Sequence, residues 1–257
     1  DTEKGKFYFI KTAPKSILVE ELLISMLPKA LTSIGWKKSM KWSDHSLLWG
    51  RPLRSIFALF NGKKITFQFD HLESSDEIII EQDLGSKRKK VKNLKDYYNL
   101  LKSNNIVLDH IEREKIILKK INATSKSKDY KEALNLKLLE EVVNIVENPN
   151  VLLVNFNKEY LKIPQEIIIS TLEKHQRYFP IFDSRGRLTN NFFVVANKKD
   201  EKKFISIGNK RVVEARLVDA KFFWDKDRSK NLIKQIVNLK TVTFYEKLGT
   251  IYDKTQR

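Results

Sequence analysis

The chain lacks cysteine entirely, and it contains only eight glycines, six prolines and two methionines among its 257 residues. The absence of cysteine excludes disulfide bridges and metal sites built from thiolates. No apolar run approaches the roughly 20 residues that a membrane-spanning helix needs, and no signal peptide opens the chain. These absences lead us to expect a cytoplasmic protein that does not contact a membrane.

Motifs that bind nucleotides or carry nucleophilic catalysis are also missing. The sequence has no GxxxxGK[ST] phosphate loop, no GxGxxG after a strand and no GxSxG nucleophile elbow. The histidines, His45, His71, His110 and His175, are far apart in the sequence, and none has the i, i+4 spacing of a helical zinc site. We therefore expect no catalytic residue, cofactor site or metal site on this chain.

Positive charge is what the chain has in excess. It carries 49 Lys and Arg against 32 Asp and Glu, a formal net charge of +17. Segment 86–137 holds 15 basic and 6 acidic residues, a net charge of +9, and its sharpest point is the run Lys87, Arg88, Lys89 and Lys90. Such an excess predicts a polyanionic partner such as RNA. Compositional drift is the alternative, since abundant isoleucine and asparagine accompany the lysines.

The hydrophobic periodicity predicts an α+β fold in which antiparallel hairpins pack against helices. Polar residues 122–131 read as a surface loop, and residues 229–257 read as two helices. The expected strands cover 6–12, 55–60, 64–69, 151–156, 177–182 and 190–197. One helix is expected after Pro14, and residues 94–121 are expected to form two more. Further helices are expected at 131–149, 164–175 and 209–227.

Two turns carry specific signals. Asn61-Gly62 favours a type I′ hairpin turn, which needs positive φ at both central residues. Asp183 and Gly186 fit the first and fourth positions of a type I turn. The strands on either side of this second turn should form a hairpin whose more buried face carries Phe179, Ile181, Phe193 and Val195.

A compact polar cluster, His175, Gln176 and Arg177, follows the helix that starts at Pro164. Helical spacing puts His175 on the same face as Ile168 and Leu172, toward apolar neighbours. The cluster is therefore either a candidate catalytic site or a capped and packed helix end.

A series of longer motifs follows one order along the chain: KSMKW at 38–42, RP at 51–52, a long block at 138–183, NNFFVVAN at 190–197, a block at 207–227 and LKTVTFYEKLGTIYDKTQR at 239–257. Together they resemble the β subunit of the bacterial two-subunit glycyl-tRNA synthetase. One departure stands out, because the GHRF-like segment expected after the RP element is absent. Glu81, Gln82 and Asp83 lie near its place.

The resemblance implies an α2β2 glycine–tRNA ligase in which the α subunit binds glycine and ATP with Mg²⁺. The β subunit would bind tRNA(Gly) and the α subunit, and this piece alone would be inactive. Residues 1–225 would form a domain similar to the B3/B4 module of phenylalanyl-tRNA synthetase, with a basic helical segment near 86–137. Residues 226–257 would be the helical start of an HD-like domain. Because the chain starts at Asp1 and ends in an unfinished helical pattern, we expect a longer polypeptide.

Two other functions remain open at this stage. Related B3/B4-like domains clear mischarged tRNA, so an editing-type hydrolase is one alternative. A basic RNA-binding or interaction module without enzymatic role is the other. If the run from Lys87 to Lys90 binds RNA, we expect phosphate contacts rather than base readout.

Overall fold

The computed structural model describes residues 5–6, 18–82, 85–131 and 134–256. They fall into two compact units, Asp1–Asn104 and Asn105–Arg257. The domain boundary expected after residue 225 lies inside a continuous helix, α6 (Phe204–Ser229). That boundary stays a prediction, and the strand expected at 6–12 lies almost wholly outside the described residues.

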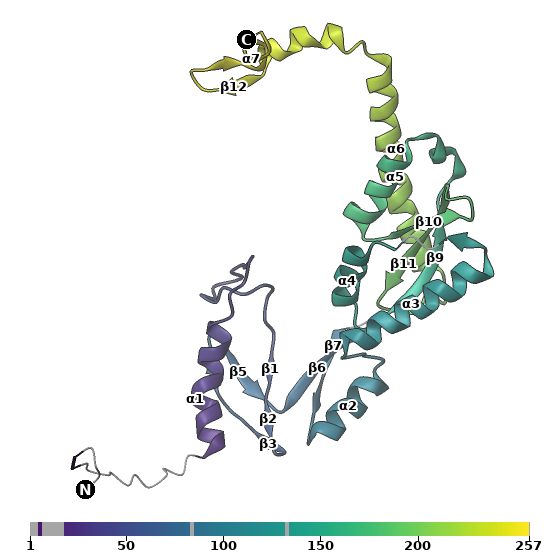
Figure 1. Cartoon of the computed structure of the whole chain (residues 1–257). Helices are drawn as coiled ribbons and strands as arrows, with labels where there is room; N and C mark the ends of the chain where they lie inside the picture. The colour runs from purple at the N-terminus through teal and green to yellow at the C-terminus, as the bar shows by residue number, and fades with distance from the viewer. Residues whose placement is uncertain (1–4, 7–17, 83–84, 132–133, 257) are drawn as a thin grey trace. The chain divides into compact units, whose positions relative to one another are not determined.

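The first unit combines one long helix with short strands (Figure 1). Strand β1 runs parallel to β5, which pairs antiparallel with β4, while β2–β3 and β6–β7 are separate hairpins. The elements are α1 (Val19–Thr32), β1 (Ile56–Phe57), β2 (Leu59–Phe60), β3 (Lys63–Lys64), β4 (Gln68–Phe69), β5 (Leu72–Ser75), β6 (Glu77–Gln82), β7 (Gly85–Lys90) and α2 (Leu94–Ser103).

The predicted turn at Asn61-Gly62 is confirmed, since both residues have positive φ, 48° and 75°. The hairpin is shorter than expected, because β1 pairs with β5 and not with the strand beyond the turn. The buried Ser74 hydroxyl donates a hydrogen bond to the Ile65 carbonyl, over 2.7 Å, and accepts one from the Phe67 N–H, over 2.9 Å. Ile65, Phe67 and Phe69 form the centre of this unit's core.

The second unit is built on one four-stranded antiparallel sheet, in the order β8-β10-β11-β9. Its elements are α3 (His110–Ser127), β8 (Tyr130–Lys131), α4 (Leu136–Ile145), β9 (Asn150–Asn155), η1 (Lys158–Lys162), α5 (Gln165–Ser170), η2 (Thr171–His175), β10 (Phe179–Asp183), β11 (Leu188–Ala196), α6 (Phe204–Ser229), η3 (Ile233–Thr241), β12 (Thr243–Tyr245), β13 (Gly249–Thr250) and α7 (Ile251–Thr255).

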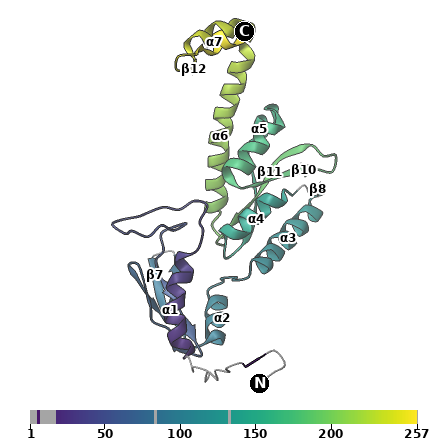
Figure 2. The same ribbon diagram turned by 60° about the vertical axis from the view of Figure 1, so that its left-hand side comes forward.

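Helices cover both faces of this sheet, as Figures 1 and 2 show. One face, with Phe179 and Phe193, packs against α3 and α4. The other face, with Phe192 and Val194, packs against residues of α5, η2 and α6. The β10–β11 hairpin is therefore confirmed. The face with Phe179 and Phe193 is buried as predicted, but the opposite face is buried as well. Double coverage explains why β11 reads as an unbroken apolar run, FFVVA.

Two expectations about the second unit are wrong. Residues 122–127 continue α3 and do not form a loop, because Ser125 is buried one turn beyond Ile121 on the helix face that meets the sheet. In the described part of 229–257, which was expected to form two helices, the chain forms η3, the β12–β13 hairpin and the short α7. The basic segment near 86–137 spans both units: it begins with strand β7 and is helical over Leu94–Ser103 and His110–Ser127.

His175 also departs from its predicted place, since its side chain is exposed. The reason is local: Thr171–His175 is a single π-helical turn, so the α-helical spacing counted from Ile168 no longer holds there.

Among the described residues, no helix is both long enough and apolar enough to cross a bilayer.

Candidate functional site

The cationic run lies on strand β7 of the β6–β7 hairpin, and the whole strand is exposed. Because side chains alternate across a strand, the run divides between two faces. Lys87 and Lys89 stand opposite Ile80 and Ile78, whereas Arg88 and Lys90 stand opposite Ile79 and Glu77. We call the side that carries Lys87 and Lys89 the lysine face of the hairpin.

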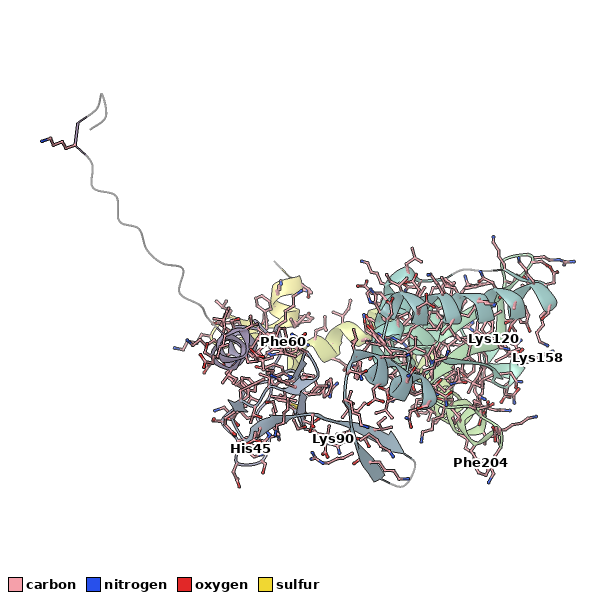
Figure 3. All side chains as sticks on the ribbon, turned by 90° about the horizontal axis from the view of Figure 1, so that it is seen from below. His45, Phe60, Lys90, Lys120, Lys158 and Phe204 are labelled. Atoms are coloured by element: carbon pink, nitrogen blue, oxygen red, sulfur yellow. The ribbon has the colours of Figure 1, made fainter. Side chains whose placement is uncertain are left out.

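The other side of the hairpin is partly neutralised by carboxylates. Lys90 Nζ lies 2.9 Å from Asp76 Oδ2, and Arg88 Nη1 lies 3.9 Å from Glu77 Oε2 (Lys90 is labelled in Figure 3). The hydrogen bond from Lys90 lowers the pKa of the Asp76 carboxyl, and the same contact raises the pKa of Lys90. Within the described part of the chain, neither Lys87 nor Lys89 has an ion pair.

Free positive charge on an exposed strand is suited to phosphate groups. A lysine without a carboxylate partner can neutralise a phosphate and release the counterion condensed on the nucleic acid, which is the main source of non-specific affinity. Arg88 and Lys90 would first have to give up Glu77 and Asp76. Of the four residues in the run, Lys87 and Lys89 are therefore the better candidates for phosphate contacts.

The polar cluster His175, Gln176 and Arg177 lies at the end of a helix. Arg177 has a positive φ of 60° and forms an ion pair with Glu141. Its guanidinium also donates to the carbonyl groups of Glu173 and Lys174 at the end of the helix. These contacts satisfy backbone groups that a helix end leaves without partners, which favours the packed-end interpretation for Arg177.

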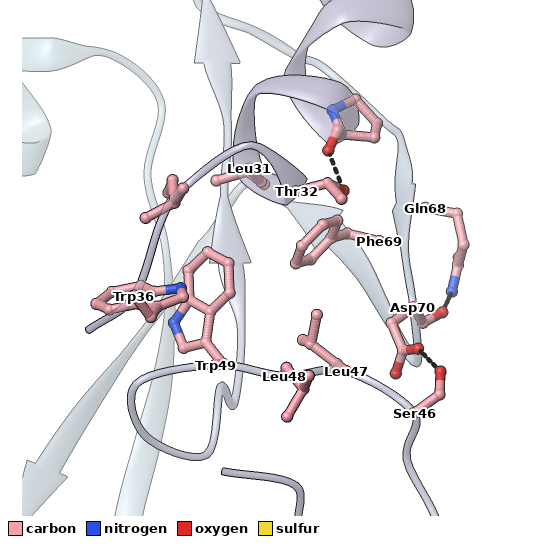
Figure 4. A pocket seen from close by; sticks show the side chains of 12 residues that line it. Leu31, Thr32, Trp36, Ser46, Leu47, Leu48, Trp49, Gln68, Phe69 and Asp70 are labelled. Atoms are coloured by element: carbon pink, nitrogen blue, oxygen red, sulfur yellow. Dashed lines mark hydrogen bonds between the residues drawn. The ribbon is translucent and has the colours of Figure 1, made fainter. Parts of the chain in front are cut away.

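The first unit contains a cavity of about 480 Å³ that the sequence does not reveal. Trp36, Trp49 and Phe69 supply aromatic walls, and Ser46 and Asp70 lie at a polar side (Figure 4). The two indoles are in contact, with centroids 4.9 Å apart. Tryptophans near the KSMKW and RP motifs are the one signal that could have pointed to this cavity.

Two histidines that are distant in sequence meet beside Asp70. The rings of His45 and His71 stack with centroids 3.6 Å apart, and His71 Nδ1 lies 2.9 Å from Asp70 Oδ2. Hydrogen bonds from His71 and then from Ser46 hold the pKa of the Asp70 carboxyl below its ordinary value, against the opposing effect of burial. Helical spacing in the sequence does not reveal this pair, because the two residues meet across loops.

The fold and the hairpin define a basic α+β chain with an exposed cationic strand and no nucleotide-binding motif in its sequence. The family model described as glycyl-tRNA synthetase beta subunit matches residues 1–257. The chain belongs to this family, as the order of its motifs predicts.

Several curated relatives are glycine–tRNA ligase beta subunits. The chain is 40% identical over 260 residues to the one from Buchnera aphidicola subsp. Acyrthosiphon pisum (strain 5A), covering 99% of this chain and 37% of the relative. It is 36% identical over 258 residues to that of Dictyoglomus thermophilum, with 100% and 37% coverage. It is 38% identical over 255 residues to that of Clostridioides difficile (strain 630), with 99% and 37% coverage. The chain thus spans little more than a third of the length of these relatives.

Proposed function

We propose that the chain is part of a glycine–tRNA ligase, the enzyme that attaches glycine to tRNA(Gly) with ATP. Its role is to support tRNA recognition and assembly with the α subunit in an α2β2 complex. Glycine, ATP and Mg²⁺ are bound by the α subunit, and this chain holds no cofactor. The family membership supports this assignment, and a tRNA partner implies a cytoplasmic location.

The observation that carries the tRNA-binding role is the lysine face of the β6–β7 hairpin. Lys87 and Lys89 are exposed on one side of a regular strand, and no carboxylate pairs with them among the described residues. The Cα atoms of alternate strand residues lie roughly 6.5–7 Å apart, so the side chains of Lys87 and Lys89 leave the backbone at that spacing. That spacing is close to the spacing of successive phosphates in a nucleic-acid strand, so both groups can bind one RNA backbone.

The test compares two variants with the same change of net charge. In one, Lys87→Gln and Lys89→Gln remove the lysine face; in the other, Arg88→Gln and Lys90→Gln remove the neutralised side. The lysine-face variant should bind tRNA(Gly) more weakly than wild type, with a log–log salt slope flatter by roughly 0.7–0.9 for each lost phosphate contact. The matched control should change the slope less.

The pattern of outcomes separates the candidate functions. Equal slopes and affinities for wild type and both variants would leave the hairpin as a solvated surface and the charge excess as compositional drift. A changed preference between tRNAs would indicate base readout in place of phosphate contacts. Hydrolysis of mischarged tRNA by the chain would favour the editing-type alternative.

A further inference from the structure

The cluster of His45, Asp70 and His71 brings three metal-ligating side chains together from two separate loops. One donor atom from each of the three lies within 4.8 Å of the others. Asp70 and His71 form the two-residue turn between β4 and β5, where Phe69 pairs with Leu72. His45 comes from the loop between Trp42 and Leu47, and Figure 3 labels it in the first unit.

The local structure holds the carboxylate in place before any ion arrives. The Ser46 hydroxyl donates to Asp70 Oδ1 over 2.7 Å, and Gln68 Nε2 donates to the Asp70 carbonyl over 2.8 Å (both dashed in Figure 4). Asp70 has a positive φ of 50°, a conformation that aspartate tolerates better than most residues. The side chains of Asp70 and His71 are only 21% and 19% exposed.

The two imidazoles are close enough to share one ion after a single ring turns. Their planes are now nearly parallel, at 7°. A metal lies close to the plane of each imidazole that binds it, so one ion cannot bind both rings in this stack. In the arrangement we infer, the ring of His45 turns, because His45 lies in a loop outside the helices and strands. The Trp42 indole makes edge-type contacts with both imidazoles. Its ring centroid lies 6.2 Å from that of His45 and 5.7 Å from that of His71.

We propose that His45, Asp70 and His71 form a binding site for a divalent transition-metal ion of the Zn²⁺ type. Two imidazoles and one carboxylate match the nitrogen and oxygen ligands that Zn²⁺ takes, whereas Ca²⁺ and Mg²⁺ prefer oxygen alone. The ion replaces the proton between Asp70 and His71, while Ser46 keeps its hydrogen bond to Oδ1. Three protein ligands leave a fourth position for water.

The ion would join the loop between Trp42 and Leu47 to the β4–β5 turn. Asp70 and Ser46 also line the cavity of the first unit, so the ion would lie at its polar side. A ligand that binds the folded chain alone stabilises it by mass action. Zn²⁺ should therefore raise the melting temperature of the chain in proportion to the logarithm of its concentration.

The experiment uses the full chain without a histidine tag, stripped of metal by chelator and titrated with Zn²⁺ alone in a calorimeter. We expect one equivalent to bind, and Co²⁺ in its place should give visible ligand-field absorption. His45→Ala should weaken binding by more than the roughly 10–100-fold that loss of an outer-shell partner costs. His110→Ala is the matched control, because His110 also follows an aspartate, with Nδ1 3.7 Å from Asp109 Oδ1, and belongs to no such cluster among the described residues.

Binding that is equally weak in wild type and His45→Ala, or equally impaired by His110→Ala, would overturn the proposal. His71→Ala lies in a tight turn and could unfold the unit, which circular dichroism would show. His45→Ala, in a loop, then still decides the question. No tRNA is present in these titrations, so their result is independent of the proposed function.

Discussion

A single side chain organises the turn between β10 and β11. Asp183 Oδ1 accepts hydrogen bonds from the backbone N–H groups of Arg185 and Arg187, over 3.0 Å and 2.8 Å. Its other oxygen accepts from Arg187 Nε over 2.8 Å. These contacts lower the pKa of the Asp183 carboxyl from its ordinary value, and the hydrogen bond from the Arg187 backbone N–H has the largest effect. The charged form of Asp183 therefore stabilises the fold.

The stability that Asp183 contributes should depend on pH in one direction. A carboxyl whose pKa is lower in the folded state stabilises the fold above its unfolded pKa, and this stabilisation is lost as pH falls toward the folded value. Wild type should melt at a higher temperature than Asp183→Asn at pH 6. The difference should shrink below the ordinary value of 3.8. A melting difference that stays constant from pH 6 to pH 3 would contradict this role.

Two phenylalanines provide a matched test of burial. Phe193 is 3% exposed between the sheet and the α3–α4 layer, whereas Phe204 is 72% exposed at the start of α6. Phe193→Ala should lower the free energy of unfolding by about 3–5 kcal/mol, because it leaves a cavity that the core cannot fill. Phe204→Ala should change it by less than about 0.5 kcal/mol. Urea unfolding of both variants measures the contrast, and similar losses would disprove the assignment of β11.

The residue scale also shows where sequence patterns stop being informative. Phe193 could be placed correctly because strand alternation depends only on its neighbours. His175 could not, because one π-helical turn changes the rotation per residue and no sequence signal marks it. The meeting of His45 with His71 depends on how two loops fold over the core, so no local pattern predicts it.

At the scale of elements, two glycines should respond in opposite ways to the same substitution. Gly62 has a φ of 75° and a new Cβ would lie 3.3 Å from the Lys92 carbonyl, whereas Gly208 is helical with open space around it. Gly62→Ala should destabilise the chain by about 1–2 kcal/mol, the cost of a left-handed residue. Gly208→Ala should stabilise it by about 0.4–1 kcal/mol.

Thermal melting of the two alanine variants provides the measurement. A melting temperature of Gly62→Ala equal to or above that of wild type would show that the hairpin turn does not require positive φ at residue 62. Since the substituted atoms are identical, the added methyl group alone cannot produce opposite signs.

Elements with a strong local signal were predictable, and elements decided by packing were not. The turns at Asn61-Gly62 and Asp183–Gly186 specify their own backbone, and both are confirmed. The end of α3 was missed because the polar composition of residues 122–127 hides Ser125, which is buried. The β12–β13 hairpin was missed because Lys247 and Gly249, with φ of 72° and 91°, were assigned to a helix.

At the scale of the whole molecule, the chain alone should not activate glycine. Its sequence has no ATP-binding motif, and the proposed function assigns glycine and ATP to the α subunit. The purified chain should therefore give no glycine-dependent ATP–pyrophosphate exchange above buffer. Exchange that rises with chain concentration and requires glycine would contradict the proposal. A complete α2β2 enzyme is the positive control.

Family membership could be predicted at this scale because it depends on motifs distributed along the whole chain. The division into two units could not, since residues 104 and 105 lie between two helical patterns without a distinctive linker. The lysine face needed the register of β6 and β7, because the run Lys87–Lys90 reads as four equal charges in the sequence.

The two-residue repeat of β7 has a consequence for how this protein can change by insertion or deletion. Removing Ser86 while the hairpin keeps its register would shift Lys87 and Lys89 to the side that now carries Arg88 and Lys90. The number of charges would be unchanged, yet Asp76 and Glu77 would then face former lysine-face residues. Which cationic side chains lack a carboxylate partner therefore depends on the odd or even position of each residue along β7 as well as on the composition of the strand.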